Sequence, residues 1–213
     1  ALSQFCGPDD IITPISTEDE ATRTRLGYPG PQNYLAPLRD YMPLDFINLL
    51  VRRKKKKRYN NHIAAARICK HLEPDIWQNY YKFCFERNPW DKVVSLYFWR
   101  HRREPRPDFA KFAASRDALY VKRKGWGLYT LHGEVCVDKV CRFEEIEAEL
   151  AQLQAHLQLP GELHLLRAKS ATRTAEYHYS AMYKDIAARE RIALAFKEEI
   201  KLLNYEFTEF GAP

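Results

Sequence analysis

The sequence lacks the features of a disulfide-stabilised, zinc-binding or membrane-spanning protein. Five cysteines are present, an odd number, and no two of them form a C-x-x-C pair. This pattern argues against a disulfide framework and against a structural zinc site. No apolar run is long enough to span a bilayer, and no charged segment followed by an apolar one leads the sequence. We therefore expect a protein of the reducing cytoplasm with no transmembrane segment and no metal site.

Short motifs that bind nucleotides or nucleic acids are also missing. The phosphate-binding pattern G-x-x-x-x-G-K-S/T does not occur. A kinase of the P-loop type would need its lysine and a metal-binding aspartate, and the sequence shows neither. No RNP-type aromatic motif, zinc finger or helix-turn-helix pattern is present.

The composition is that of a folded chain with a sizeable core. The chain has 213 residues, 46% of them hydrophobic and 13% aromatic, which suits one α/β domain. The formal net charge of +6 is compatible with nucleic acid, an anionic membrane surface, an acidic polysaccharide or an anionic ligand as partner.

Much of the positive charge lies in an unbroken run of seven basic residues at 52–58, Arg-Arg-Lys-Lys-Lys-Lys-Arg. The simplest interpretation is a solvated loop. A functional interpretation is electrostatic guidance of an anionic ligand into a site, and a nuclear or nucleic-acid signal is a third.

The most informative stretch is 81–97, where a run of bulky apolar residues leads directly into a helix start. Asn88 suits the N-cap, Pro89 the first helical position, and Asp91 places a carboxylate in the first turn. We expect a buried strand at 80–86, with Arg87 at its carboxyl edge, where open α/β sheets bind ligands. Ser95 would share a helix face with Asn88 and Asp91. A guanidinium and a hydroxyl beside a helix N-terminus predict a phosphate site. The alternative is that Arg87 pairs with Glu86 or Asp91 and that Ser95 has no ligand.

Further elements follow from periodicity and turn residues. We expect helices at 61–71, 88–103, 109–116, 142–159 and 184–203, a short strand at 11–15, a hairpin at 128–138 around His132-Gly133, and a late strand at 163–166.

The segment with Arg87, Pro89 and Ser95 resembles the 3'-phosphate-binding element of sulfotransferases that use 3'-phosphoadenosine 5'-phosphosulfate (PAPS). "FCGPDDIITPISTEDE" at 5–20, "YPGPQNY" at 28–34, "NNH" at 60–62 and "VDKVCRFEEIE" at 137–147 are similar to the sulfotransferase family 2 group, which is related to carbohydrate sulfotransferases. The resemblance covers nearly the whole chain. It implies a single α/β domain over 1–213 with a P-loop-NTPase-like parallel sheet flanked by helices.

The family opens with a strand and a loop that grips the 5'-phosphosulfate, and this loop has no counterpart in the sequence. The first residues look like the helix that would follow it. Either the sequence is truncated or this member lost the loop, and we favour truncation.

The resemblance and the local sequence together give candidate roles to four further residues. His62 is the candidate general base: it follows two asparagines and opens an apolar helical segment, whose positive end keeps an imidazole neutral. Related 2-O-sulfotransferases have a basic histidine in a similar place; the alternative is an N-cap or an acceptor contact. Lys169, Ser170 and Arg173 look similar in kind to a late basic loop that contacts the 3'-phosphate in cytosolic sulfotransferases, although its Gly-Trp-Lys pattern is absent. A solvated loop is the alternative there.

The predicted function is transfer of a sulfuryl group from PAPS to an acceptor hydroxyl, on a carbohydrate or a small molecule, with adenosine 3',5'-bisphosphate (3',5'-ADP) as the product. His62 would take the hydroxyl proton, and Arg87 and Ser95 would anchor the nucleotide, with no specific nucleic acid as partner. The alternative is a basic module that binds nucleic acid or an anionic surface and keeps only a vestigial nucleotide cleft.

Overall fold

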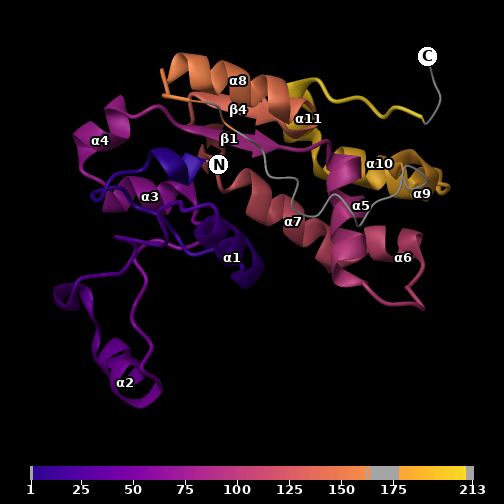
Figure 1. The fold of residues 1–213 in the computed structure, drawn as a ribbon. Helices are drawn as coiled ribbons and strands as arrows, with labels where there is room; N and C mark the ends of the chain where they lie inside the picture. Colours follow the sequence, from indigo (N-terminus) through magenta and orange to yellow (C-terminus); the bar gives the residue numbers. More distant parts are fainter. Residues whose placement is uncertain (1, 162, 164–177, 210–213) are drawn as a thin grey trace. The chain divides into compact units, whose positions relative to one another are not determined.

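The computed structural model describes residues 2–161, 163 and 178–209. The chain divides into two compact units, which are described separately below (Figure 1). Unit 1 holds the described residues of Ala1–Tyr80 and Leu150–Ala168, and unit 2 holds those of Tyr81–Glu149 and Lys169–Pro213. None of the helices in the described part of the chain is long and apolar enough to cross a membrane.

Unit 1 consists of short helices joined by proline-rich loops. Ser16 starts its first long helix, because its hydroxyl accepts a hydrogen bond from the backbone N–H of Asp19 (3.2 Å). The strand predicted at 11–15 is wrong: only Ile12 forms a bridge, with Gln32. The elements are η1 (Leu2–Phe5), α1 (Thr17–Arg25), η2 (Leu38–Asp40), α2 (Pro43–Arg52), α3 (Ala65–His71) and α4 (Pro74–Asn79).

Unit 2 is built around two parallel strands. β1 (Phe83–Glu86) pairs with β4 (Lys139–Arg142), and Phe83 lies opposite Lys139 while Glu86 lies opposite Arg142. The remaining elements are α5 (Pro89–Arg100), α6 (Phe109–Ala113), α7 (Arg116–Trp126), the antiparallel hairpin β2 (Thr130–Leu131) and β3 (Glu134–Val135), η3 (Phe143–Glu145), α9 (Tyr179–Met182), α10 (Ile186–Ala195) and α11 (Lys197–Leu203). Helix α8 (Ile146–His156) begins in unit 2 and ends in unit 1.

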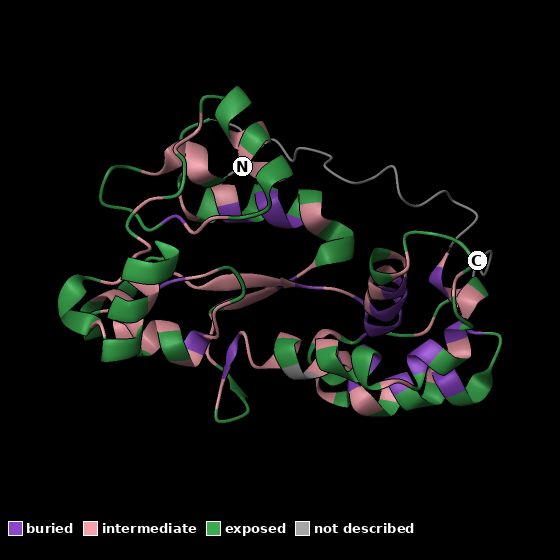
Figure 2. Cartoon of the chain, turned by 90° about the horizontal axis from the view of Figure 1, so that it is seen from below, coloured by how far each residue is buried: buried purple, intermediate pink, exposed green. Residues whose placement is uncertain are grey.

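The core of unit 2 forms around α5. Buried residues gather on this helix and on the helices that pack against it (purple in Figure 2). Val93 and Val94 are fully buried, and Trp90 and Tyr97 are nearly so. Residues on α6, α7, α9 and α10, together with Tyr183, Phe196 and Tyr205, complete the cluster. Because α5 is packed into the core, the end of β1 that directly precedes it is anchored there as well.

Several predicted elements are confirmed and others are corrected. The strand before Arg87, the helix after it and the hairpin around His132-Gly133 are present. The long C-terminal helix is wrong, since it breaks at Phe196 into α10 and α11. The helix predicted from residue 142 starts later because Arg142 ends β4. Of the strand predicted at 163–166, only Leu163 lies within the described residues, and it is not in a strand.

At the coarse level the α/β prediction is confirmed as a mixed fold with a small parallel sheet and helices around it. The P-loop-like arrangement and the single domain over 1–213 stay predictions.

Candidate functional site

The turn between β1 and α5 has the geometry that the sequence indicates. The Asn88 side-chain oxygen accepts hydrogen bonds from the backbone N–H groups of Trp90 (3.1 Å) and Asp91 (3.4 Å). Pro89 occupies the first helical turn, where its missing N–H costs nothing. Because the cap already uses these amides, an anion at this helix end would be held mainly by side chains.

Arg87 lies at the carboxyl edge of the parallel pair, between two neighbours. Its Nε is 2.5 Å from Asp91 Oδ2, and its guanidinium carbon is 4.4 Å from the centre of the Phe143 ring. The Nε–H makes no hydrogen bond within the described residues, so the contact with Asp91 is an ion pair without an aligned hydrogen bond. The side chain keeps 27% of its surface exposed. The alternative in which Arg87 pairs with Asp91 is thus confirmed for the unliganded protein.

The segment that follows β4 is hydrogen-bonded to the turn that follows β1. Glu144 accepts a hydrogen bond from the backbone N–H of Asn88 (2.7 Å). Tyr205 places its hydroxyl 2.9 Å from the second Glu144 oxygen and 3.0 Å from the carbonyl oxygen of Glu86. Burial, with Glu144 close by, raises the pKa of Tyr205, so the hydroxyl remains a donor at neutral pH. The positions after the two strands are therefore tied together.

Glu144 and Tyr205 were not predicted as site residues. The only signal for Glu144 is its place in the string "VDKVCRFEEIE" at 137–147, which carries part of the resemblance but gives Glu144 no role. For Tyr205 nothing local distinguishes it from a core aromatic residue, because its partners lie more than sixty residues away along the chain.

A buried ion pair lies at the end of β1. Glu86 is 3% exposed and forms an ion pair with Lys92 one turn into α5. Tyr129 donates a hydrogen bond to the other Glu86 oxygen (3.1 Å), and burial raises the pKa of Tyr129. Gly125 leaves room for this pair, since a Cβ there would stand 3.1 Å from Lys92 Nζ. Removing one partner of such a buried, hydrogen-bonded carboxylate is strongly destabilising, so Lys92 and Tyr129 both support the end of β1.

Ser95 lies one turn beyond Asp91 on α5 and is half-buried. Residues four apart on a helix lie on the same face, with Cβ atoms roughly 5–6 Å apart. The guanidinium that pairs with Asp91 and the Ser95 hydroxyl therefore share one face of α5. This is the predicted placement relative to Asn88 and Asp91.

His62 lies in unit 1, in a different local setting from the predicted one. It is exposed, and its φ of +59° places it in a turn. The helix that follows starts only at Ala65, with Ala64 as its N-cap, so the expected position at a helix N-terminus is wrong. The backbone departs from a helix because Ile63 donates its N–H to the carbonyl oxygen of Asn60 (3.2 Å), which closes a tight turn.

Lys169, Ser170 and Arg173 lie outside the described residues.

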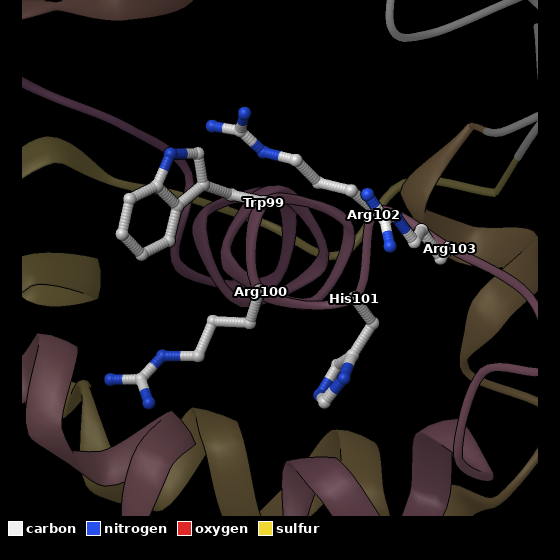
Figure 3. Close-up of a pocket in the computed structure, with 5 residues that line it drawn as sticks. All are labelled: Trp99, Arg100, His101, Arg102 and Arg103. Carbon is white, nitrogen blue, oxygen red and sulfur yellow. The ribbon is translucent and has the colours of Figure 1, made fainter.

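An open hollow lies at the other end of α5 and is lined by Trp99, Arg100, His101, Arg102 and Arg103 (Figure 3). The side chains of Trp99 and Arg102 extend to one side of the helix, and those of Arg100 and His101 to the other (Figure 3). Arg100 is already paired with Asp117 at 3.0 Å. Because these groups diverge, they do not surround one ligand. Within the described residues no group of three His, Cys, Asp or Glu side chains is placed to hold a metal ion.

Comparison with known proteins gives a relative without a described activity. No family model matches the sequence, and no solved structure matches the fold. An uncharacterized protein of Archaeoglobus fulgidus is 36% identical over 93 residues, an alignment that covers 41% of this chain and 76% of that protein. The chain therefore belongs to the same family as this uncharacterized archaeal protein.

Proposed function

We propose that the protein is a sulfotransferase that moves a sulfuryl group from PAPS to an acceptor hydroxyl, with a carbohydrate as the favoured acceptor. The observation that carries the proposal is Arg87 at the carboxyl edge of β1, stacked on Phe143 and paired with Asp91, which lies one helical turn before Ser95 on α5. Ligands of open α/β sheets bind at this edge, and a guanidinium matches the geometry of phosphate oxygens. The resemblance to the 3'-phosphate element of PAPS sulfotransferases points to the same residues.

The 3'-phosphate would take the place of Asp91 as the main partner of Arg87. Nε of the guanidinium contacts Asp91 through a pair that has no aligned hydrogen bond. The terminal nitrogens of a guanidinium can donate two parallel, charge-assisted hydrogen bonds to a phosphate, which are among the strong hydrogen bonds of proteins. Phe143 holds the plane of the guanidinium while its partner is exchanged.

The reaction then needs one proton transfer and one displacement. His62 keeps the role of base on the resemblance to 2-O-sulfotransferases alone, since no helix starts at it. It takes the proton of the acceptor hydroxyl, and the oxygen forms a bond to sulfur as the bond from sulfur to the 5'-phosphate oxygen breaks. Adenosine 3',5'-bisphosphate leaves, held by Arg87 and Ser95. In this proposal Lys169, Ser170 and Arg173 add contacts to the 3'-phosphate. All five cysteines are free thiols, which suits the reducing cytoplasm that we propose as its location.

The test is calorimetric titration with adenosine 3',5'-bisphosphate, ADP and ATP. We expect tight binding of the first and weak binding of the others. Replacing Arg87 with Ala removes a charged partner of a phosphate and should cost about 2–4 kcal/mol, a loss of affinity of roughly 30-fold or more. Asp91→Asn should have the opposite effect, because it removes the carboxylate that competes for Arg87.

Arg100→Ala is the matched control, since Arg100 lies on the same helix and is also paired with an aspartate. It should leave the affinity unchanged. A preference for ATP, or equal affinities in the wild type and in Arg87→Ala, would rule out the proposed donor site.

A further inference from the structure

Helix α2 presents an apolar face that the described residues of unit 1 leave uncovered. Ile47 lies three residues after Leu44, and Leu50 and Val51 lie three and four residues after Ile47, so the four share one face. Their exposed fractions are 69%, 54%, 80% and 76%. No residue of α2 is buried, and the helix lies apart from α1 and α3 (Figure 1). A helix of a globular protein normally turns such a face to the core.

The residues that follow α2 carry a concentrated positive charge. Arg52, Arg53, Lys54, Lys55 and Lys57 of the basic segment 52–58 are exposed. The stretch 38–58 contains eight basic and two acidic residues, a net charge of +6 that equals the formal net charge of the whole chain. The charge excess of the protein is therefore confined to the neighbourhood of the uncovered apolar face.

Lys56 joins the basic segment to the helix. Its ammonium donates to Asp45 Oδ2 (2.7 Å) and to the carbonyl oxygen of Asp40 (2.8 Å), and its backbone N–H donates to the Tyr41 hydroxyl (2.9 Å). Arg53 ends α2 in the left-handed conformation, with a φ of +49°, and so turns the chain at once. These contacts hold the apolar face and the exposed cations in one local structure, and they neutralise Asp45.

We propose that α2 and segment 52–58 form a surface that binds anionic lipid bilayers. The apolar face would lie in the interface between headgroups and acyl chains, while the exposed arginines and lysines contact lipid phosphates. An RNA ligand would use the cations but has no use for four exposed aliphatic side chains. A protein partner would cover the aliphatic face but would not need so many cations beside it. This surface is independent of the proposed donor site in unit 2.

The experiment is co-flotation of the full chain with vesicles of an equimolar mixture of phosphatidylglycerol and phosphatidylcholine, compared with vesicles of phosphatidylcholine alone. We expect binding to the anionic vesicles that weakens as salt is added. Each basic residue near an anionic surface contributes about fivefold to binding. The quadruple variant with Gln at Arg52, Arg53, Lys54 and Lys55 should therefore bind at least about a hundredfold more weakly.

The apolar face needs its own variant. The double change Ile47→Asn and Leu50→Asn leaves every charge in place and replaces only exposed residues. It should weaken vesicle binding at least about tenfold. Its matched control is Ile186→Asn with Leu194→Asn, two aliphatic residues of α10 that are 69% and 74% exposed.

The charge control replaces Arg102, Arg103, Lys111 and Lys201 with Gln, four exposed basic residues of unit 2. Both controls should bind vesicles as the wild type does. The proposal would be overturned if the wild type bound neutral and anionic vesicles equally. It would also be overturned if a variant and its control lost equal affinity, or if the charge variant of segment 52–58 or the apolar variant of α2 bound as the wild type does. Binding of single-stranded RNA in place of vesicles would assign the segment to nucleic acid and overturn it as well.

Discussion

Lys122→Met is expected to destabilise unit 2 strongly at neutral pH and weakly in acid. The Lys122 ammonium lies 2.6 Å from Glu199 and 2.7 Å from Glu198, and the side chain of Glu199 is fully buried. Methionine keeps the volume of the stem but leaves the carboxylate of Glu199 without its cation. Breaking a buried pair in this way costs about 3–5 kcal/mol. Since Lys122 itself is 21% exposed, we expect a value near the low end, about 3 kcal/mol.

The pH dependence follows from the direction of the Glu199 pKa. Burial raises this pKa even though Lys122 opposes the shift. A raised pKa means that the contribution of Glu199 to stability is complete below its unfolded value of about 4.3 and is lost as pH rises through the folded value. Without Lys122 the folded pKa rises further. The stability gap between wild type and variant should therefore be small near pH 4 and grow toward pH 8.

The assay is urea unfolding followed by tryptophan fluorescence between pH 4 and pH 8. Lys111→Met, at an exposed lysine, is the control and should change the free energy of unfolding by less than about 0.5 kcal/mol. A gap for Lys122→Met that does not change with pH, or that stays below 1 kcal/mol at pH 8, would refute the reasoning.

Three further predictions concern other parts of unit 2. Asp138→Asn should lower the free energy of unfolding by about 1 kcal/mol, because Asp138 accepts hydrogen bonds from the Lys82 backbone N–H (2.6 Å) and side chain. These bonds lower the pKa of Asp138, so the difference in stability between wild type and variant should vanish as pH falls through that lowered pKa, in the same urea assay. Cys84, whose pKa is raised to about 12 by burial and then by a nearby carboxylate, should react with iodoacetamide at pH 8 about a thousandfold more slowly than an ordinary cysteine, as peptide mass spectrometry can show. Ser115→Ala removes the N-cap of α7 and should lower the midpoint of thermal unfolding by about 2–4 °C, the equivalent of about 1 kcal/mol, in calorimetry.

The strand–turn–helix unit at Arg87 could be predicted from the sequence because its signals are local. A cap at Asn88, a proline in the first turn and a run of bulky apolar residues before them each act within a few positions. β4 could not be found in this way. Its four residues, Lys-Val-Cys-Arg, have no clear alternation, and they form a strand because β1 supplies a parallel partner fifty-six residues earlier.

Helix α7 was missed, and the helix at His62 was misplaced, for related reasons. The apolar residues of α7 form a short run, Ala118 to Val121, and such a run does not by itself distinguish a helix from a strand; the structure shows a helix that packs Ala118 into the core. At His62 the apolar residues that follow suggest an early helix start, but the turn at Asn60 delays it to Ala65. Within the site, the pairing of Arg87 with Asp91 was foreseen as an alternative, whereas the Glu144 and Tyr205 contacts depend on tertiary structure.

The measurement that tests the central claim most directly compares adenosine 3',5'-bisphosphate with adenosine 5'-monophosphate on wild type and Arg87→Ala. The two nucleotides differ only in the 3'-phosphate, so the ratio of their dissociation constants reports what the protein gains from it. We expect a ratio of roughly 30 or more in the wild type and a ratio lower by roughly 30-fold in the variant. The same large ratio in both proteins would show that Arg87 does not bind the 3'-phosphate and would contradict the proposed donor site.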